Sequence, residues 1–179
     1  MQEAERLEFW RAIWRIYYQA YYHEILSEAV QARLMLATRI ADLLTAVTAS
    51  GSAVAAWAVW QSNAMSVVWV ALSSTAALLS VVFQALGVRD LSKRYTESRL
   101  VAQTLRLRVA GFRNKLRITN DWDSERLLSQ LDAFESEFRE FLKQHPQDSM
   151  LESEHLKNHA QSRVDLLLAN EIADDSPAS

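Results

Sequence analysis

The most informative pattern along the chain is a run from Leu43 to Val88 in which no residue carries a charge. The polar tripeptide Gln61-Ser62-Asn63 divides this run into two apolar stretches, 43–60 and 64–88. As helices they would reach about 27 and about 37 Å, against a bilayer core of about 30 Å. The pattern predicts a two-helix transmembrane hairpin. A hairpin buried inside a soluble helical bundle is the alternative, because the first stretch is rich in Ala, Ser and Thr.

The segment before this run, 1–42, has the pattern of one long helix. Glycine and proline are scarce in the chain, and no strand-like alternation appears. Apolar residues recur at four-three spacing, and a second aromatic row runs beside them: Phe9, Ile13, Ile16 and Ala20, with Trp10, Trp14, Tyr17 and Tyr21. We expect this aromatic-rich helix to begin near Glu3, to continue into the hairpin and to pack on other helices.

After the run, segment 89–118 is predicted to continue the second span as a long basic helix. Its apolar residues keep the four-three repeat of a packed seam. We assign to this candidate seam, in an oligomer or within one bundle, Leu91, Tyr95, Ala102, Leu105, Val109 and Phe112. Gly111 is expected to weaken the helix without ending it.

The remaining residues, 119–171, predict a pair of helices. Capping residues 119–121 begin the first, which ends at Pro146 and presents a candidate partner face of Phe134, Phe138 and Phe141. The second is expected to begin at Ser149, with Glu152 completing a capping box, and a disordered tail covers 172–179. The predicted fold is therefore all-α: a transmembrane hairpin with long helices that extend into a cytoplasmic bundle.

The distribution of charge predicts how the hairpin is oriented. Between Arg89 and Arg117 nine basic residues face only Asp90 and Glu97, and the acidic residues follow later. Basic residues beside a span are retained in the cytoplasm, so we expect both termini to be cytoplasmic. The same basic run has two other interpretations. It is either a solvated face paired with the acidic helix after it, or a surface for anionic lipid, nucleotide or nucleic acid.

Side chains that could support catalysis or bind a metal are few. The chain has no cysteine, and its three glycines form no phosphate-binding loop. His155 and His159 stand one helical turn apart, a spacing that can hold a metal, but neither an HExxH glutamate nor a third ligand accompanies them. A solvated helix face is the favoured interpretation. We expect no enzymatic activity, no cofactor and no metal site.

Polar residues inside the apolar run suggest a candidate pore lining. Three serines repeat at seven-residue spacing and a glutamine follows one turn later: Ser66, Ser73, Ser80 and Gln84. Hydroxyls that bond to their own helix carbonyls are the alternative. Because two helices cannot enclose a pore, conduction would require a homo-oligomer of about four or more chains.

The aromatic N-terminal helix (Trp10 to Tyr22), the tight turn at 61–63 and the long basic helix after the second stretch resemble the SLATT group of bacterial two-transmembrane effectors. The resemblance covers roughly Phe9 to Leu116. It implies a multi-pass protein of the bacterial inner membrane that takes part in antiviral defence. Members of the group are thought to permeabilise that membrane and stop growth before a phage replicates. Retron-associated two-span effectors are similar in plan.

The residues and the resemblance together favour a pore-forming effector, an ion channel that oligomerises and depolarises the inner membrane when triggered. The chain has no recognisable nucleotide-sensing domain. Its trigger is therefore expected from a separate sensor protein or from the C-terminal helices. The alternative is a non-conducting membrane-anchored scaffold that recruits a cytoplasmic partner through its helical bundle.

Overall fold

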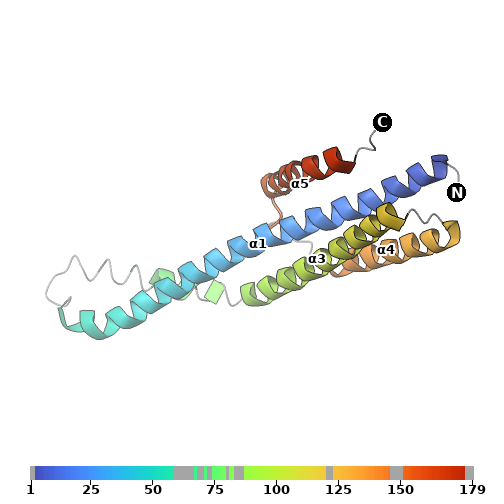
Figure 1. The fold of residues 1–179 in the computed structure, drawn as a ribbon. Helices are drawn as coiled ribbons and strands as arrows, with labels where there is room; N and C mark the ends of the chain where they lie inside the picture. The colour runs from blue at the N-terminus through green and yellow to red at the C-terminus, as the bar shows by residue number, and fades with distance from the viewer. Residues whose placement is uncertain are drawn as a thin grey trace. The chain divides into compact units, whose positions relative to one another are not determined.

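Helices make up the architecture (Figure 1). The computed structural model describes residues 3–58, 67, 71, 74–79, 81–82, 87–119, 123–145 and 151–175. The helices with defined bounds are α1 (Glu3–Ala58), α3 (Val88–Thr119), α4 (Ser124–Gln144) and α5 (Glu154–Asp175). No strand occurs among the described residues, and the predicted all-α class is confirmed.

The chain divides into two compact units. The first, called the bundle unit below, comprises Met1–Gln31 and Arg94–Ser179. It contains the N-terminal half of α1, most of α3, and all of α4 and α5. The second unit comprises Ala32–Lys93 and includes the apolar run.

In the second unit, the described residues cover only part of the predicted hairpin. The turn at 61–63 and most of the stretch 64–88 lie outside the described residues. Among the helices of the described part, none has a segment long and apolar enough to cross a membrane.

The N-terminal helix agrees with its sequence pattern. α1 begins at Glu3 and continues without a break to Ala58. Its apolar stripe is buried in the bundle unit, with Phe9, Ile13, Ile16 and Ala20 between 0 and 4% exposed. The aromatic row beside the stripe is buried or half-buried. Because the stripe recurs on one face of the helix, α1 can cover the other bundle helices with that face.

The start of α3 corrects the prediction of an uninterrupted second helix. Gly87 has a φ of 58°, in the left-handed region that favours glycine. The backbone N–H groups of Asp90 and Leu91 donate to the Gly87 carbonyl at 2.9 and 3.0 Å, which begins a new helix. Further along, Gly111 stays within α3, as predicted.

The boundaries of α4 and α5 agree with the prediction at one place and differ from it at two. α4 ends at Gln144, because His145 precedes Pro146 and a residue before proline is driven out of the helical region. The predicted start at Ser149 is wrong, since α5 begins at Glu154. The amides of Leu156 and Lys157 donate to the Ser153 carbonyl, and Glu152 lies before the helix. α5 continues to Asp175, past the expected start of the tail at 172.

Candidate functional site

The structure describes the residues of the candidate seam but not those of the candidate pore lining. Ser66, Ser73, Ser80 and Gln84 all lie outside the described residues. The seam residues lie on α3, where Tyr95, Ala102, Leu105 and Val109 are between 0 and 4% exposed, while Leu91 and Phe112 are half-buried. The Phe112 ring packs edge-on against Phe9 of α1 and Phe134 of α4. The seam from Tyr95 to Phe112 therefore packs within the bundle unit of a single chain, while Leu91 belongs to the second unit.

The three phenylalanines predicted to face a partner lie in the core instead. Phe134, Phe138 and Phe141 are 4, 8 and 4% exposed. Phe138 and Phe141 pack against His23 of α1, at ring-centroid distances of 6.1 and 5.3 Å. The four-three pattern identifies an apolar face, and the chain's own helices cover that face. A partner therefore has no access to these rings in this arrangement.

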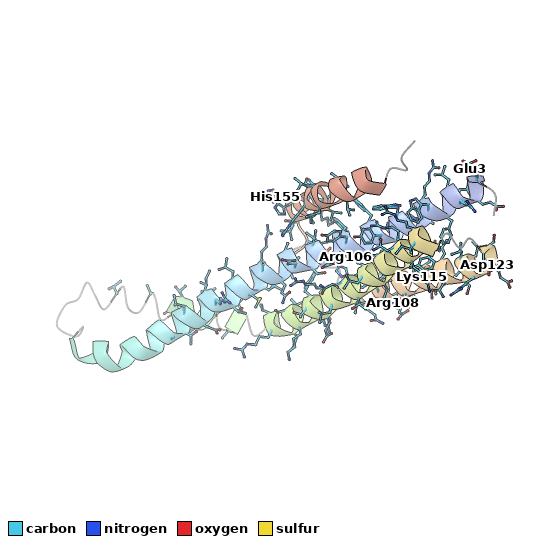
Figure 2. All side chains as sticks on the ribbon, viewed as in Figure 1. Glu3, Arg106, Arg108, Lys115, Asp123 and His155 are labelled. Carbon is cyan, nitrogen blue, oxygen red and sulfur yellow. The ribbon has the colours of Figure 1, made fainter. Side chains whose placement is uncertain are left out.

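Ion pairs within the bundle unit engage part of the basic run. Arg106 Nε lies 2.6 Å from Glu24 Oε2, and both side chains are largely buried. Arg108, two residues on and more exposed, contacts both carboxylate oxygens of Glu137. Figure 2 shows Arg106 and Arg108 on α3. These pairs favour the interpretation of the run as a face matched to acidic residues.

One arginine of the run is inside the bundle. Arg113 is 6% exposed, and its guanidinium carbon lies 4.2 Å from the Trp14 ring centroid and 4.7 Å from that of Tyr17. A planar cation stacked on aromatic faces keeps part of its electrostatic stabilisation when it leaves water. The aromatic row of α1 thus holds a cation of α3 inside the bundle.

The most concentrated polar group in the bundle surrounds His145. Its backbone is extended (φ −64°, ψ 124°), and its N–H donates to the Phe141 carbonyl at 2.8 Å. This bend at the end of α4 turns the ring inward, where 2% of the side chain is exposed. The His145 ring lies 4.9 Å from the ring of His23, which comes from α1. We call these two residues the histidine pair.

Each ring nitrogen of His145 faces a different polar group. Nδ1 lies 2.5 Å from Ser98 Oγ of α3, and Nε2 lies 3.3 Å from Glu152 Oε1. The contact with Ser98 has a hydrogen-bond distance, whereas Nε2 approaches the carboxylate at an ion-pair distance and has no hydrogen-bond partner among the described residues. Tyr95 of α3 donates to the same Glu152 oxygen at 3.0 Å. Glu152 therefore joins the turn before α5 to both α3 and α4.

His23 has a different environment. Its Nδ1 is buried and has no hydrogen-bond partner among the described residues. Burial, reinforced by the neighbouring His145, lowers the pKa of His23 to about 4, although the Glu152 carboxylate opposes the shift. His23 is therefore neutral at pH 7 in the folded chain.

In the Glu152 carboxyl group the charged form is favoured, whereas in His23 the neutral form is favoured. Burial favours its neutral form, but the hydrogen bond from Tyr95 and the contact with His145 outweigh that effect and lower the pKa of Glu152. A carboxyl group whose folded pKa is lowered stabilises the fold above its usual pKa, and this contribution is lost as the pH falls through the folded value. Glu152 therefore remains ionised in the range where histidines titrate.

The order serine, histidine, glutamate suggests comparison with a hydrolase triad. Ser98 is 7% exposed and lies in the middle of α3, where the backbone N–H groups are used in the helix. An acyl-transfer site needs N–H donors aimed at a developing oxyanion beside the nucleophile. The chemistry that this cluster's geometry supports is the gain and loss of a proton by His23.

The histidine pair was not found by sequence reasoning. His23 and His145 are far apart in the chain, so no short spacing connects them. The available signals were a histidine within the aromatic stripe of α1 and a histidine directly before Pro146. The other two histidines, His155 and His159, are exposed on α5, where Figure 2 labels His155. No group of three potential metal ligands occurs in the described part of the chain.

Comparisons with protein-family models, with curated proteins and with solved structures find no match to this chain.

Proposed function

We propose that this chain is a membrane effector of a bacterial antiviral defence system. Its apolar run forms a two-helix hairpin in the inner membrane, and both termini are cytoplasmic. The observation that carries the proposal is the absence of charge from Leu43 to Val88 beside nine basic residues between Arg89 and Arg117. Apolar stretches of this length with basic flanks are typical of membrane spans. The resemblance to SLATT effectors supports the defence role.

In this proposal the bundle unit is the cytoplasmic part that receives the trigger. A separate sensor protein shifts the population of the effector from a resting assembly to a conducting one. Homo-oligomers of about four or more chains place Ser66, Ser73, Ser80 and Gln84 around a pore. Contacts between chains would use surfaces other than the α3 seam, since its residues Tyr95, Ala102 and Val109 are buried within one chain.

Replacing Ser80 with phenylalanine is expected to reduce toxicity on expression by at least about tenfold, because a bulky apolar ring would narrow a weakly polar pore. The matched control is Leu78→Phe, since two residues along a helix change the direction of a side chain by about 200°. Both variants should reach the membrane fraction in wild-type amounts. Equal toxicity of Ser80→Phe and the wild-type chain would contradict the lining.

A hairpin exchange separates the effector from the scaffold. In this experiment an unrelated two-span anchor replaces residues 43–88. We expect the exchanged chain to lose toxicity while its bundle unit stays folded, because the pore depends on the replaced residues. A chain that keeps full activity with a foreign anchor would identify a scaffold instead, with the hairpin serving as attachment alone.

A further inference from the structure

The bundle unit contains a device that the proposed function does not use. His23 of α1 and His145 at the end of α4 meet in the interior, beside the turn that leads into α5. We propose that this histidine pair is a pH-sensitive switch. While His23 is neutral the pair holds the beginning of α5 on the bundle, and the binding of a proton to His23 releases it. The inference concerns the bundle unit and is independent of membrane conduction.

The groups that face the pair come from every neighbouring element. Phe138 and Phe141 of α4 cover His23, and Tyr22 of α1 packs against it. Tyr95 and Ser98 of α3 and Glu152 before α5 surround His145. Arg94 and Glu97 of α3 line a small cavity of about 80 Å³ next to His145. Two charged residues of α5 shift the pKa of Tyr22 in opposite directions: Glu154 raises it and Lys157 lowers it.

The cluster does not accommodate a positive charge on His23. The buried Nδ1 of His23 has no hydrogen-bond partner among the described residues. Its ring packs against Phe138 and Phe141 and lies 4.9 Å, between ring centroids, from His145. A cation there would lose hydration without gaining a hydrogen bond at Nδ1, and opening the cluster to water restores that hydration.

The part that opens is expected to be the beginning of α5. Glu152 is the described residue through which the turn before α5 contacts His145 and Tyr95. Beyond the turn, α5 is held by a buried row at every fourth position, Leu156, Ala160, Val164 and Leu168. Tyr18 of α1 also donates to Asp165 at 2.7 Å. The Tyr18 hydroxyl keeps its proton between pH 5.5 and 7.5, because burial and Asp165 raise the pKa of Tyr18 to about 12.

The sign of the pH effect follows from the His23 environment. Its pKa is about 4 in the folded chain and 6.5 in the unfolded reference. The opened form therefore binds more protons below pH 6.5, and the closed form is lost as the pH falls toward 4. Between pH 7.5 and 5.5 one such group should favour opening by about tenfold. Glu152 stays ionised in this window.

Hydrogen–deuterium exchange of the purified full-length chain tests the switch. We expect peptides that cover 151–160 to lose about tenfold in protection between pH 7.5 and 5.5, after correction for intrinsic exchange. His23→Gln should reduce this loss to less than about threefold, because the amide does not titrate. His145→Gln, which can still contact Ser98 and Glu152, is the second variant and should keep most of the loss, because burial is the main cause of the lowered pKa of His23.

The exposed histidines of α5 provide the control. The double variant His155→Gln, His159→Gln removes two imidazole rings outside the cluster and should keep the full tenfold loss. Equal protection of the wild-type chain at both pH values would overturn the switch. So would an unchanged loss in His23→Gln. Membrane depolarisation is not part of this readout, so the result stands apart from the proposed function.

Discussion

Replacing Arg106 with methionine is expected to lower the free energy of unfolding of the bundle unit by about 3 kcal/mol. The Arg106 and Glu24 side chains are only 18 and 9% exposed, and their charged atoms are 2.6 Å apart. Without its partner, the Glu24 carboxylate would be buried and uncompensated. The guanidinium also lies 4.4 Å from the Tyr21 ring centroid, a contact that methionine cannot make electrostatically. Urea unfolding of the full-length chain, followed by proteolytic susceptibility of α3, measures the change.

Arg108→Met is the matched control, with the same substitution on the same helix. The Arg108 and Glu137 side chains are 54 and 41% exposed, so the loss should be below about 1 kcal/mol. The double variant Arg106→Met, Glu24→Gln should recover most of the lost stability, because no buried charge is left alone. Equal losses of stability in Arg106→Met and Arg108→Met would show that burial of the Arg106–Glu24 pair does not increase its contribution to the free energy of unfolding.

Phe141→Ala is expected to destabilise the bundle unit by about 3 to 5 kcal/mol, a large part of the total stability of a typical domain. The side chain is 4% exposed and packs on three other rings, those of His23, Phe138 and His145. Truncation would leave a cavity where α1 and α4 meet the histidine pair. The same urea experiment measures this loss.

Leu128→Ala on α4 is the control, because Leu128 is 54% exposed. Its substitution should change stability by less than about 0.5 kcal/mol. Comparison of Phe141→Ala with Leu128→Ala also distinguishes a core role of the phenylalanine face from a partner-binding role. If this face binds a partner, Phe141→Ala should leave the isolated chain as stable as the Leu128 variant. That result would contradict the core assignment.

The sequence predicts those parts of the fold that depend on local periodicity. The stripe from Phe9 to Ala20 and the α3 residues from Tyr95 to Val109 are buried as their spacing indicates. The end of α4 is also predictable, because Pro146 constrains the residue before it. In each case the determining residues are close together in the chain.

The wrong predictions involve competition between local and tertiary contacts. Ser149 and Glu152 have the spacing of a capping box, but Glu152 binds Tyr95 and His145 and α5 begins later. The periodicity around Phe138 predicts that this apolar face is buried. It does not predict whether the same chain or a partner buries it.

The histidine pair joins α1 to the end of α4, so only the packed helices bring its members together. Its chemistry depends on burial and on neighbours from α3 and from the turn before α5. A single sequence contains neither kind of information.

Membrane potential tests the central claim, that this chain permeabilises the inner membrane, most directly. A voltage-sensitive dye would follow bacteria after induction of the full-length chain, with the hairpin-exchanged chain as control. High expression favours assembly by mass action, so we expect the potential to collapse within minutes and before lysis in the wild-type culture alone. An unchanged potential, with the chain present in the membrane fraction, would contradict the claim.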